Sequence, residues 1–270
     1  MSICPKCKEG YILPGEPTGS INADFQGAYF APSPNKDSES KRAIVFLTDG
    51  FGLPLKNCKI MADNLATKLE CDVWVPDYFN GRPLIPLDTM VIDRAGVKWS
   101  IWQWIKFVAV TGIPNLPAFI SSRPSVVDKR LDSFFALLKE KKSYEKLGAV
   151  GYCFGGTTAT RLGGTDHIQS VVICHPGPPR ISDVKKIKVP AAWACAEEDQ
   201  FWGRSARLQA EAVFAARKDT DNFVEYEFKD YKGTAHGFAA RPNLDLPEIK
   251  EAFELAFEQT VQWFQKTLAV

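Results

Sequence analysis

Short apolar runs alternate with amphipathic helical stretches along most of this 270-residue chain, and that alternation constrains the fold more than any other feature. The runs at 43–47 and 147–151 have the length and continuous apolar character of strands buried on both faces. The pattern predicts a mostly parallel central sheet with helices on both faces, an α/β fold class. Further strands are expected at 72–75, 170–174, 191–196 and 223–228, and helices at 57–70, 125–142, 205–218 and 248–268.

Length and charge limit the remaining possibilities. The chain is long enough for one α/β domain, expected to span 1–270. Its net charge of +1, with basic and acidic residues intermixed, lacks the basic stripe typical of nucleic-acid binding. The most apolar stretch, 99–110, is interrupted by Gln103 and Lys106, and no signal-peptide core follows Met1. We therefore expect no nucleic-acid partner, no membrane contact and a cytoplasmic location.

The seven cysteines show no dense spacing, which favours free thiols in a reducing compartment. Cys4 and Cys7 form a Cys-x-x-Cys pair, but a structural zinc site needs four ligands and no second pair is present. The sequence also lacks both common glycine-rich phosphate loops, so we expect neither a metal nor an organic cofactor.

The segment 151–156, GYCFGG, follows the strand at 147–151 and opens a helical pattern. A sharp turn from strand to helix strains the backbone of the central residue, and the flanking glycines let neighbouring segments approach closely. This context is typical of a nucleophile elbow and makes Cys153 the candidate nucleophile. A cysteine at a helix N-terminus also has its thiolate form favoured.

An acid and a base follow at the ends of later strands. Asp199 is the expected acid, chosen over Glu197 and Glu198 because it lies deepest in the loop. His236 is the expected base, and the order nucleophile, acid, base is that of α/β-hydrolases. His175 also follows a strand and could compete with His236, although it comes early for this order.

An oxyanion hole requires two backbone donors near the nucleophile. The N–H of Phe154, directly after Cys153, is one candidate, and Gly50 in the loop after the strand at 43–47 is the other. The irregular segment 82–124 is rich in proline and tryptophan. It could be a partial lid or an ordinary crossover helix with core tryptophans.

The motifs GYCFGG at 151–156, EDQF at 198–201 and HGF at 236–238 together resemble the dienelactone hydrolase (carboxymethylenebutenolidase) family, in particular its fungal branch. The resemblance covers the chain from about residue 27 to its end. It implies an α/β-hydrolase fold, a monomer or weak homodimer, no metal or organic cofactor, and a catalytic triad of Cys153, Asp199 and His236.

The same resemblance suggests roles for other residues. Asp49 matches the position of a glutamate that holds the resting thiol in bacterial members, although direct pairing of Cys153 with His236 could replace it. A loop-capping role for Asp49 is the simpler alternative. The expected substrate-binding residues are Arg82, Arg241, Tyr78 and Trp102.

The predicted function is cysteine-dependent hydrolysis of a small-molecule lactone or ester through an acyl-enzyme intermediate. One alternative is an esterase or thioesterase that acts on a secondary metabolite. Another is a non-hydrolytic protein in which Cys153 serves as a redox-responsive or ligand-binding thiol.

Overall fold

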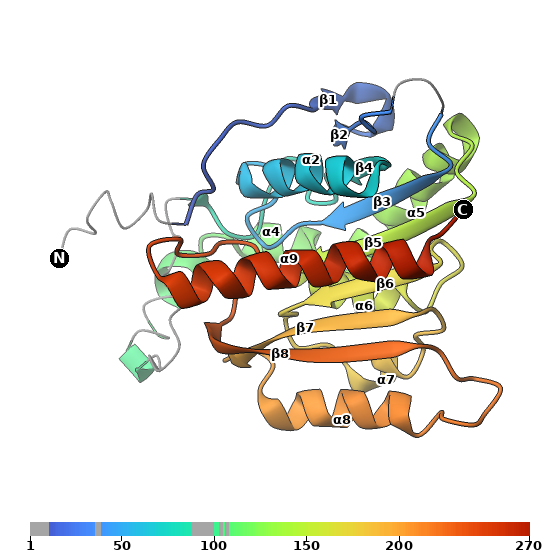
Figure 1. Cartoon of the computed structure of the whole chain (residues 1–270). Helices are drawn as coiled ribbons and strands as arrows, with labels where there is room; N and C mark the ends of the chain where they lie inside the picture. The colour runs from blue at the N-terminus through green and yellow to red at the C-terminus, as the bar shows by residue number, and fades with distance from the viewer. Residues whose placement is uncertain (1–10, 36–38, 88–99, 103–104, 106–107) are drawn as a thin grey trace.

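A computed structural model describes residues 11–35, 39–87, 100–102, 105 and 108–270. Among these residues, eight strands form one sheet in the order β1-β2-β4-β3-β5-β6-β7-β8 (Figure 1). Neighbouring strands run parallel from β4 to β8, whereas β1 and β2 pair antiparallel at one edge. The strands are β1 Ser20–Asn22, β2 Ala28–Ala31, β3 Arg42–Leu47, β4 Asp72–Val75, β5 Lys146–Tyr152, β6 Ser170–Cys174, β7 Ala191–Glu198 and β8 Tyr226–Ala235.

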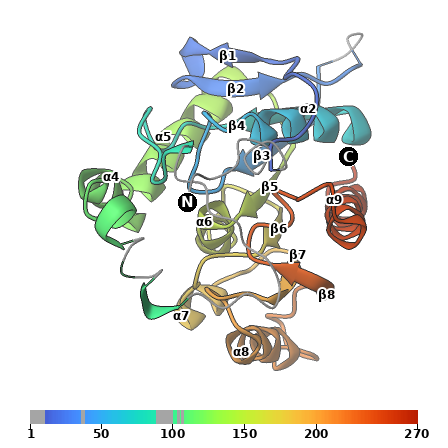
Figure 2. The same cartoon turned by 90° about the vertical axis from the view of Figure 1, so that its left-hand side faces the viewer.

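Helices cover both faces of this sheet (Figures 1 and 2). One face packs against α2 and α9, and the other against α5, α6 and α8. This arrangement is the predicted α/β-hydrolase architecture. The helical segments are η1 Ala23–Phe25, α2 Asn57–Leu69, η3 Val108–Gly112, α4 Leu116–Ser121, α5 Pro124–Lys141, α6 Phe154–Leu162, α7 Ile181–Val184, α8 Arg204–Ala215 and α9 Pro247–Thr267.

Side chains of each central strand alternate between two apolar layers, as the pleat of a strand requires. In β4, Val73 and Val75 pack in the layer with α2 and α9, whereas Trp74 lies in the layer with α5. Trp74 is fully buried and its ring meets Phe134 of α5 at a centroid distance of 6.2 Å. Burial of one such side chain stabilises the fold by about 1.5–3 kcal/mol. The strands that carry the candidate loops therefore pack against helices on both faces of the sheet.

The predicted strands and helices are present, with shifts at their ends. The largest difference is in β8, which was expected at 223–228 and extends over Tyr226–Ala235. β8 is an edge strand whose residues are mostly exposed or half-buried, so its sequence lacks a continuous apolar run. Its greater length places His236 directly after the strand.

The predicted lid or crossover segment, 82–124, is described in part. Its tryptophans Trp99 and Trp104, with Phe107, lie outside the described residues, as do Cys4 and Cys7. Over the described stretches of the chain, none of the helices combines the length and apolar character that crossing a bilayer requires.

Candidate active site

The turn from β5 into α6 has the geometry of a nucleophile elbow. Cys153 adopts φ 54° and ψ −113°, a conformation that costs a non-glycine residue about 1–3 kcal/mol. A Cβ atom on Gly151 would lie 2.1 Å from the Gly155 carbonyl oxygen, and one on Gly155 would lie 2.2 Å from the Leu47 carbonyl oxygen. The two glycines are therefore required for the helix to begin this close to the sheet.

Backbone hydrogen bonds hold the strained residue in place. The Cys153 N–H donates to the Cys174 carbonyl at 3.2 Å, and the Cys153 carbonyl accepts from the Gly177 N–H at 3.0 Å. Cys153 itself is half-buried at the N-terminus of α6.

Asp199 and His236 meet at the ends of β7 and β8. His236 Nδ1 lies 2.9 Å and 3.1 Å from the two Asp199 carboxylate oxygens, and both side chains are buried. The N–H groups of Phe201 and Trp202 donate to Asp199 Oδ1 at 2.8 Å and 3.1 Å, which fixes the carboxylate. Glu197 and Glu198 are exposed. Of the three acids considered, Asp199 is therefore the one in contact with the imidazole.

The charge environment keeps a proton on His236. Burial alone would lower the pKa of this imidazole, but the negative charges of Cys153 and Asp199, with the hydrogen bond to Asp199, raise it to about 10. Nε2, the nitrogen opposite Asp199, is buried and makes no hydrogen bond of ordinary geometry to any described residue. The site therefore fits an imidazolium held by Asp199, in which the second nitrogen is available to a reacting group.

Asp49 and Arg241, predicted separately for thiol activation and for substrate binding, form a buried ion pair. Arg241 Nε lies 3.3 Å from Asp49 Oδ2, and both side chains are less than a tenth exposed. Asp49 also accepts from the Phe51 N–H at 3.1 Å, so it caps its loop as well. Burial raises the pKa of Asp49, whereas the charges of Arg241 and His236 oppose that rise. The sequence gives no signal of this pairing.

The guanidinium of Arg241 is also confined by the histidine loop. It lies over the ring of Phe51, with 5.2 Å from Cζ to the ring centroid. Gly237 has φ +93°, and a Cβ atom there would come within 2.5 Å of Arg241 Nη2. The HGF motif thus needs glycine both for its backbone conformation and for the space that Arg241 occupies.

The two expected oxyanion donors, Gly50 and Phe154, follow the neighbouring strands β3 and β5, which pair in parallel register up to Leu47 and Gly151. Phe154 is the first residue of α6, where an N–H has no partner within the helix. Tyr78 braces the other loop by donating to the Thr48 carbonyl at 2.6 Å. Burial raises the pKa of Tyr78 well above its usual range, so this hydroxyl keeps its proton. Its buried position gives Tyr78 a structural contact in addition to the predicted role with substrate.

Two predicted substrate-binding residues lie at the surface. Arg82 is exposed in the turn after Phe79, and Trp102 is 75% exposed. Their roles with substrate stay predictions. No group of three metal-ligating side chains occurs among the described residues. The described cysteines Cys58, Cys71, Cys153, Cys174 and Cys195 are all free thiols.

His175, the alternative base, lies in contact with the ring of His236. The two ring centroids are 5.1 Å apart and the rings cross at 73°. His175 is fully buried, and neither of its ring nitrogens has a hydrogen-bond partner among the described residues. Burial, followed by the positive charges of His236 and Arg241, lowers its pKa well below the usual value. His175 is thus a neutral neighbour of His236 in a position where it has no acid to orient it.

Sequence reasoning missed two residues beside the histidine loop, Asn57 and Tyr11. Asn57 begins α2 and donates through Nδ2 to the carbonyls of Tyr11 and Ala240, at 2.8 Å and 2.9 Å. Its Oδ1 accepts from the Leu13 N–H at 2.9 Å. One buried amide therefore joins the N-terminal segment to the loop that carries His236 and Arg241. Asparagine at the start of a helix is typical of an ordinary cap, so its sequence position did not indicate this link between distant segments.

The fold and the elbow, with an Asp–His pair at the ends of β7 and β8, define an α/β-hydrolase. The dienelactone hydrolase family model matches residues 114–268, and the chain belongs to that family. It is 28% identical over 262 residues to the hydrolase tropI of Talaromyces stipitatus. The match covers 96% of this chain and 94% of that protein. The carboxymethylenebutenolidase homolog of Homo sapiens is 24% identical over 267 residues, covering 97% and 96%.

A solved structure agrees on the fold. The putative dienelactone hydrolase of Klebsiella pneumoniae superposes with a TM-score of 0.65 at 13% sequence identity, covering 88% of this chain and 92% of that one. The family match and the hydrolase relatives together identify the chain as a hydrolase acting on ester bonds. The resemblance expected from the three motifs is confirmed.

Proposed function

We propose that the protein hydrolyses a small lactone or ester through a covalent thioester on Cys153. The observation that carries this proposal is the geometry of the site, in which Cys153 occupies the strained turn into α6 and the buried His236 lies 2.9 Å from an Asp199 carboxylate oxygen. The raised pKa of His236, caused by the charges of Cys153 and Asp199, agrees with this geometry. A thiolate beside an imidazolium is the reactive state of a cysteine nucleophile. Asp199 orients the imidazole and stabilises its charge.

The chemical steps follow from this arrangement. The Cys153 thiolate attacks the substrate carbonyl carbon, and the electron pair of the C=O bond moves to oxygen. The N–H groups of Phe154 and Gly50 stabilise that oxyanion. When the C–O bond of the ester breaks, the leaving alkoxide takes the proton from His236. His236 then takes a proton from water as it attacks the thioester, and the products are a carboxylic acid and the regenerated thiolate.

Asp49 and Arg241 contribute to this site as a pair in our proposal. Asp49 lies close enough to His236 for the imidazolium to lower the carboxyl pKa. A substrate carboxylate that approached Arg241 would compete with Asp49 for the guanidinium. Release of Asp49 from Arg241 would then let its charge act more strongly on His236, so binding of an acidic substrate and activation of the site would be coupled.

Intact-protein mass spectrometry tests the covalent step. Wild type and Cys153→Ala are mixed briefly with dienelactone-type lactones and with activated acyl esters. We expect an acyl mass increment or product formation only in the wild type, and a loss of turnover by several orders of magnitude in Cys153→Ala.

Cys58→Ala is the matched control. Cys58 is a buried free thiol, and burial raises its pKa far above the usual value, so its removal should leave acylation unchanged. Turnover that persists in Cys153→Ala would exclude the thioester mechanism. Rapid alkylation of Cys153 by iodoacetamide without turnover of any ester or lactone would favour the ligand-binding or redox thiol instead.

A further inference from the structure

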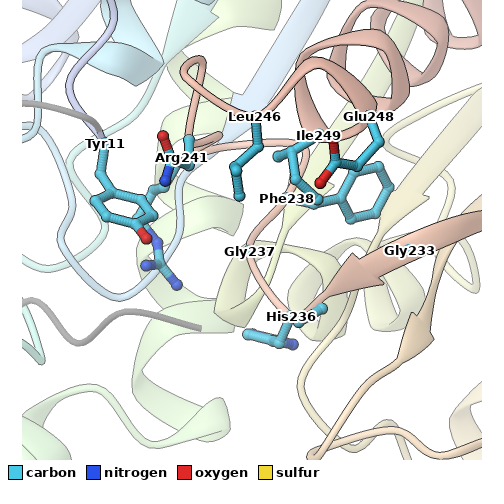
Figure 3. Close-up of a pocket in the computed structure, with 11 residues that line it drawn as sticks. Tyr11, Gly233, His236, Gly237, Phe238, Arg241, Leu246, Glu248 and Ile249 are labelled. Atoms are coloured by element: carbon cyan, nitrogen blue, oxygen red, sulfur yellow. The ribbon is translucent and has the colours of Figure 1, made fainter. Parts of the chain in front are cut away.

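A cavity of about 290 Å³ lies between the N-terminal segment and the loop that follows β8 (Figure 3). His236 and Arg241 line it on one side, and Phe238, Leu246 and Ile249 supply apolar surface. The volume suits a compact molecule and is too small for a long acyl chain. Because His236, the candidate base, is part of the wall, a molecule in this cavity lies against the loop that carries it.

Tyr11 supplies an unpaired donor to the same cavity. Its side chain is only 5% exposed, and its hydroxyl has no hydrogen-bond partner among the described residues. In Figure 3 the hydroxyl points toward the side of the cavity that holds the Arg241 guanidinium. A buried hydroxyl without a partner is destabilising, so this position favours an occupant that carries an acceptor oxygen.

The place of Tyr11 is fixed relative to the site. Asn57 is 1% exposed and binds the backbone of Tyr11, Leu13 and Ala240 at the same time. The phenol therefore has a defined distance from the loop that carries His236 and Arg241. A donor held in this way loses little entropy when it binds a ligand.

The polar groups on the cavity wall differ between its two ends, and this difference would orient a bound molecule. Arg241 lies at the inner side with Tyr11, whereas the carboxylate of Glu248 is on an exposed residue at the opposite end. Although Arg241 is paired with Asp49, the side chains of Tyr11 and Arg241 supply hydrogen-bond donors on their side of the cavity, whereas the carboxylate of Glu248 supplies acceptors at the other end. The bound molecule is therefore oriented with its second oxygen group toward Tyr11.

We propose that Tyr11 is a substrate-positioning residue whose hydroxyl donates to a second oxygen group of the ester or lactone that Cys153 attacks. The inference rests on the hydrolytic function proposed above and narrows its substrate class. The substrate is a compact molecule with a ketone or carboxylate oxygen in addition to the scissile carbonyl. Tyr11 thus selects substrates by that oxygen, while the chemistry stays with the other residues.

Three ethyl esters of similar size test this inference: ethyl pentanoate, ethyl 4-oxopentanoate and monoethyl succinate. They share the scissile bond and differ in whether a ketone or a carboxylate is present at the far end. Hydrolysis is followed by titration of released acid for the wild type and for Tyr11→Phe. We expect kcat/KM for the ketone and carboxylate esters to fall about tenfold in Tyr11→Phe, mainly through KM, with ethyl pentanoate unchanged.

Tyr231→Phe is the matched control. The Tyr231 hydroxyl is also buried but donates to Gln259 at 2.9 Å, and Tyr231 does not line the cavity. We expect Tyr231→Phe to change all three esters equally or not at all. Equal rates of wild type and Tyr11→Phe on all three esters would overturn the inference and leave the hydrolytic function standing.

A binding measurement distinguishes an error in the role of Tyr11 from an error in the proposed hydrolytic function. Succinate and 4-oxopentanoate are titrated calorimetrically into Cys153→Ala, with and without Tyr11→Phe. If no ester is turned over but Tyr11→Phe weakens binding about tenfold, the hydrolytic function fails, and only the binding of a ketone or carboxylate oxygen by Tyr11 stands. If neither turnover nor binding is observed, both are rejected.

Discussion

The two buried histidines, His236 and His175, lie 5.1 Å apart by ring centroid, yet their pKa values move in opposite directions. The pKa of His236 rises to about 10, whereas that of His175 falls well below its usual range. Burial acts in the same direction on both. The difference arises because Asp199 and Cys153 face His236, while no acid faces His175. Neighbouring charges, and not depth, decide which imidazole can serve as the base.

Replacement of each histidine in turn by an uncharged side chain should give the largest difference in activity between the two positions. We expect His236→Gln to lower kcat/KM by at least about 10⁴-fold, because a coupled nucleophile and base fail together. His175→Phe keeps an aromatic ring beside His236 and should stay within about tenfold of wild type. Steady-state hydrolysis of one ester by both variants is the measurement. Equal losses would mean that His175 takes part in the chemistry.

Asp199→Asn should make the environment of His236 more like that of His175. The amide cannot stabilise an imidazolium, so we expect kcat/KM to fall by about 10³–10⁴-fold. The upper limit of the pH profile, near pH 10 in the wild type, should move to lower pH because the pKa of His236 falls. Rate profiles from pH 6 to 11 measure both effects. Glu198→Gln, at an exposed acid one position earlier, is the control and should leave the profile in place.

The two histidines should limit stability at opposite ends of the pH range. An imidazole whose folded pKa is about 10 stabilises the protein fully below pH 6.5, and the contribution is lost as pH rises from about 6.5 to 10. A buried neutral imidazole has the reverse effect, because the unfolded chain takes up its proton below about pH 6.5. Unfolding in denaturant at several pH values should show the alkaline loss reduced in Asp199→Asn and the acid loss reduced in His175→Phe. A variant whose pH dependence matched the wild type would contradict the corresponding assignment.

The smallest expected effect is the influence of His236 on its neighbour. The charge of His236 is one of the causes that lower the pKa of His175. In His236→Gln we therefore expect the pKa of His175 to rise slightly, while burial still holds it below the usual value. Nuclear magnetic resonance of the histidine rings detects this shift. No change would show that burial alone accounts for the neutral state of His175.

Local patterns were sufficient to predict the parallel strands β3 to β8, the elbow and the Asp199–His236 pair, but they gave no prediction of the antiparallel strands β1 and β2. Continuous apolar runs indicated the buried strands, and the glycines around Cys153 indicated the elbow. The structure gives the reason for these glycines, because α6 begins too close to β3 for a larger residue. Edge strand β8 was predicted too short because its exposed side chains interrupt the apolar pattern. The roles of the individual site residues stay predictions for the experiments above.

Contacts between distant parts of the chain were beyond the sequence. The pairing of Asp49 with Arg241 joins two residues to which the family resemblance gave separate tasks. Tyr11 carried no motif, and Asn57 looked like an ordinary residue at a helix start. Each acquires its role only when the fold brings the N-terminal segment beside the loop after β8.

The amide of Asn57 has a consequence for the order of folding. Its bond to the Ala240 carbonyl spans 183 positions, and such non-local contacts form late because the loop they close is long. We expect the sheet and helices to appear before enzymatic competence during refolding. A nascent chain would likewise stay inactive on the ribosome until the segment beyond Ala240 had emerged, so its activity would begin only after the described strands of the sheet had all been synthesised.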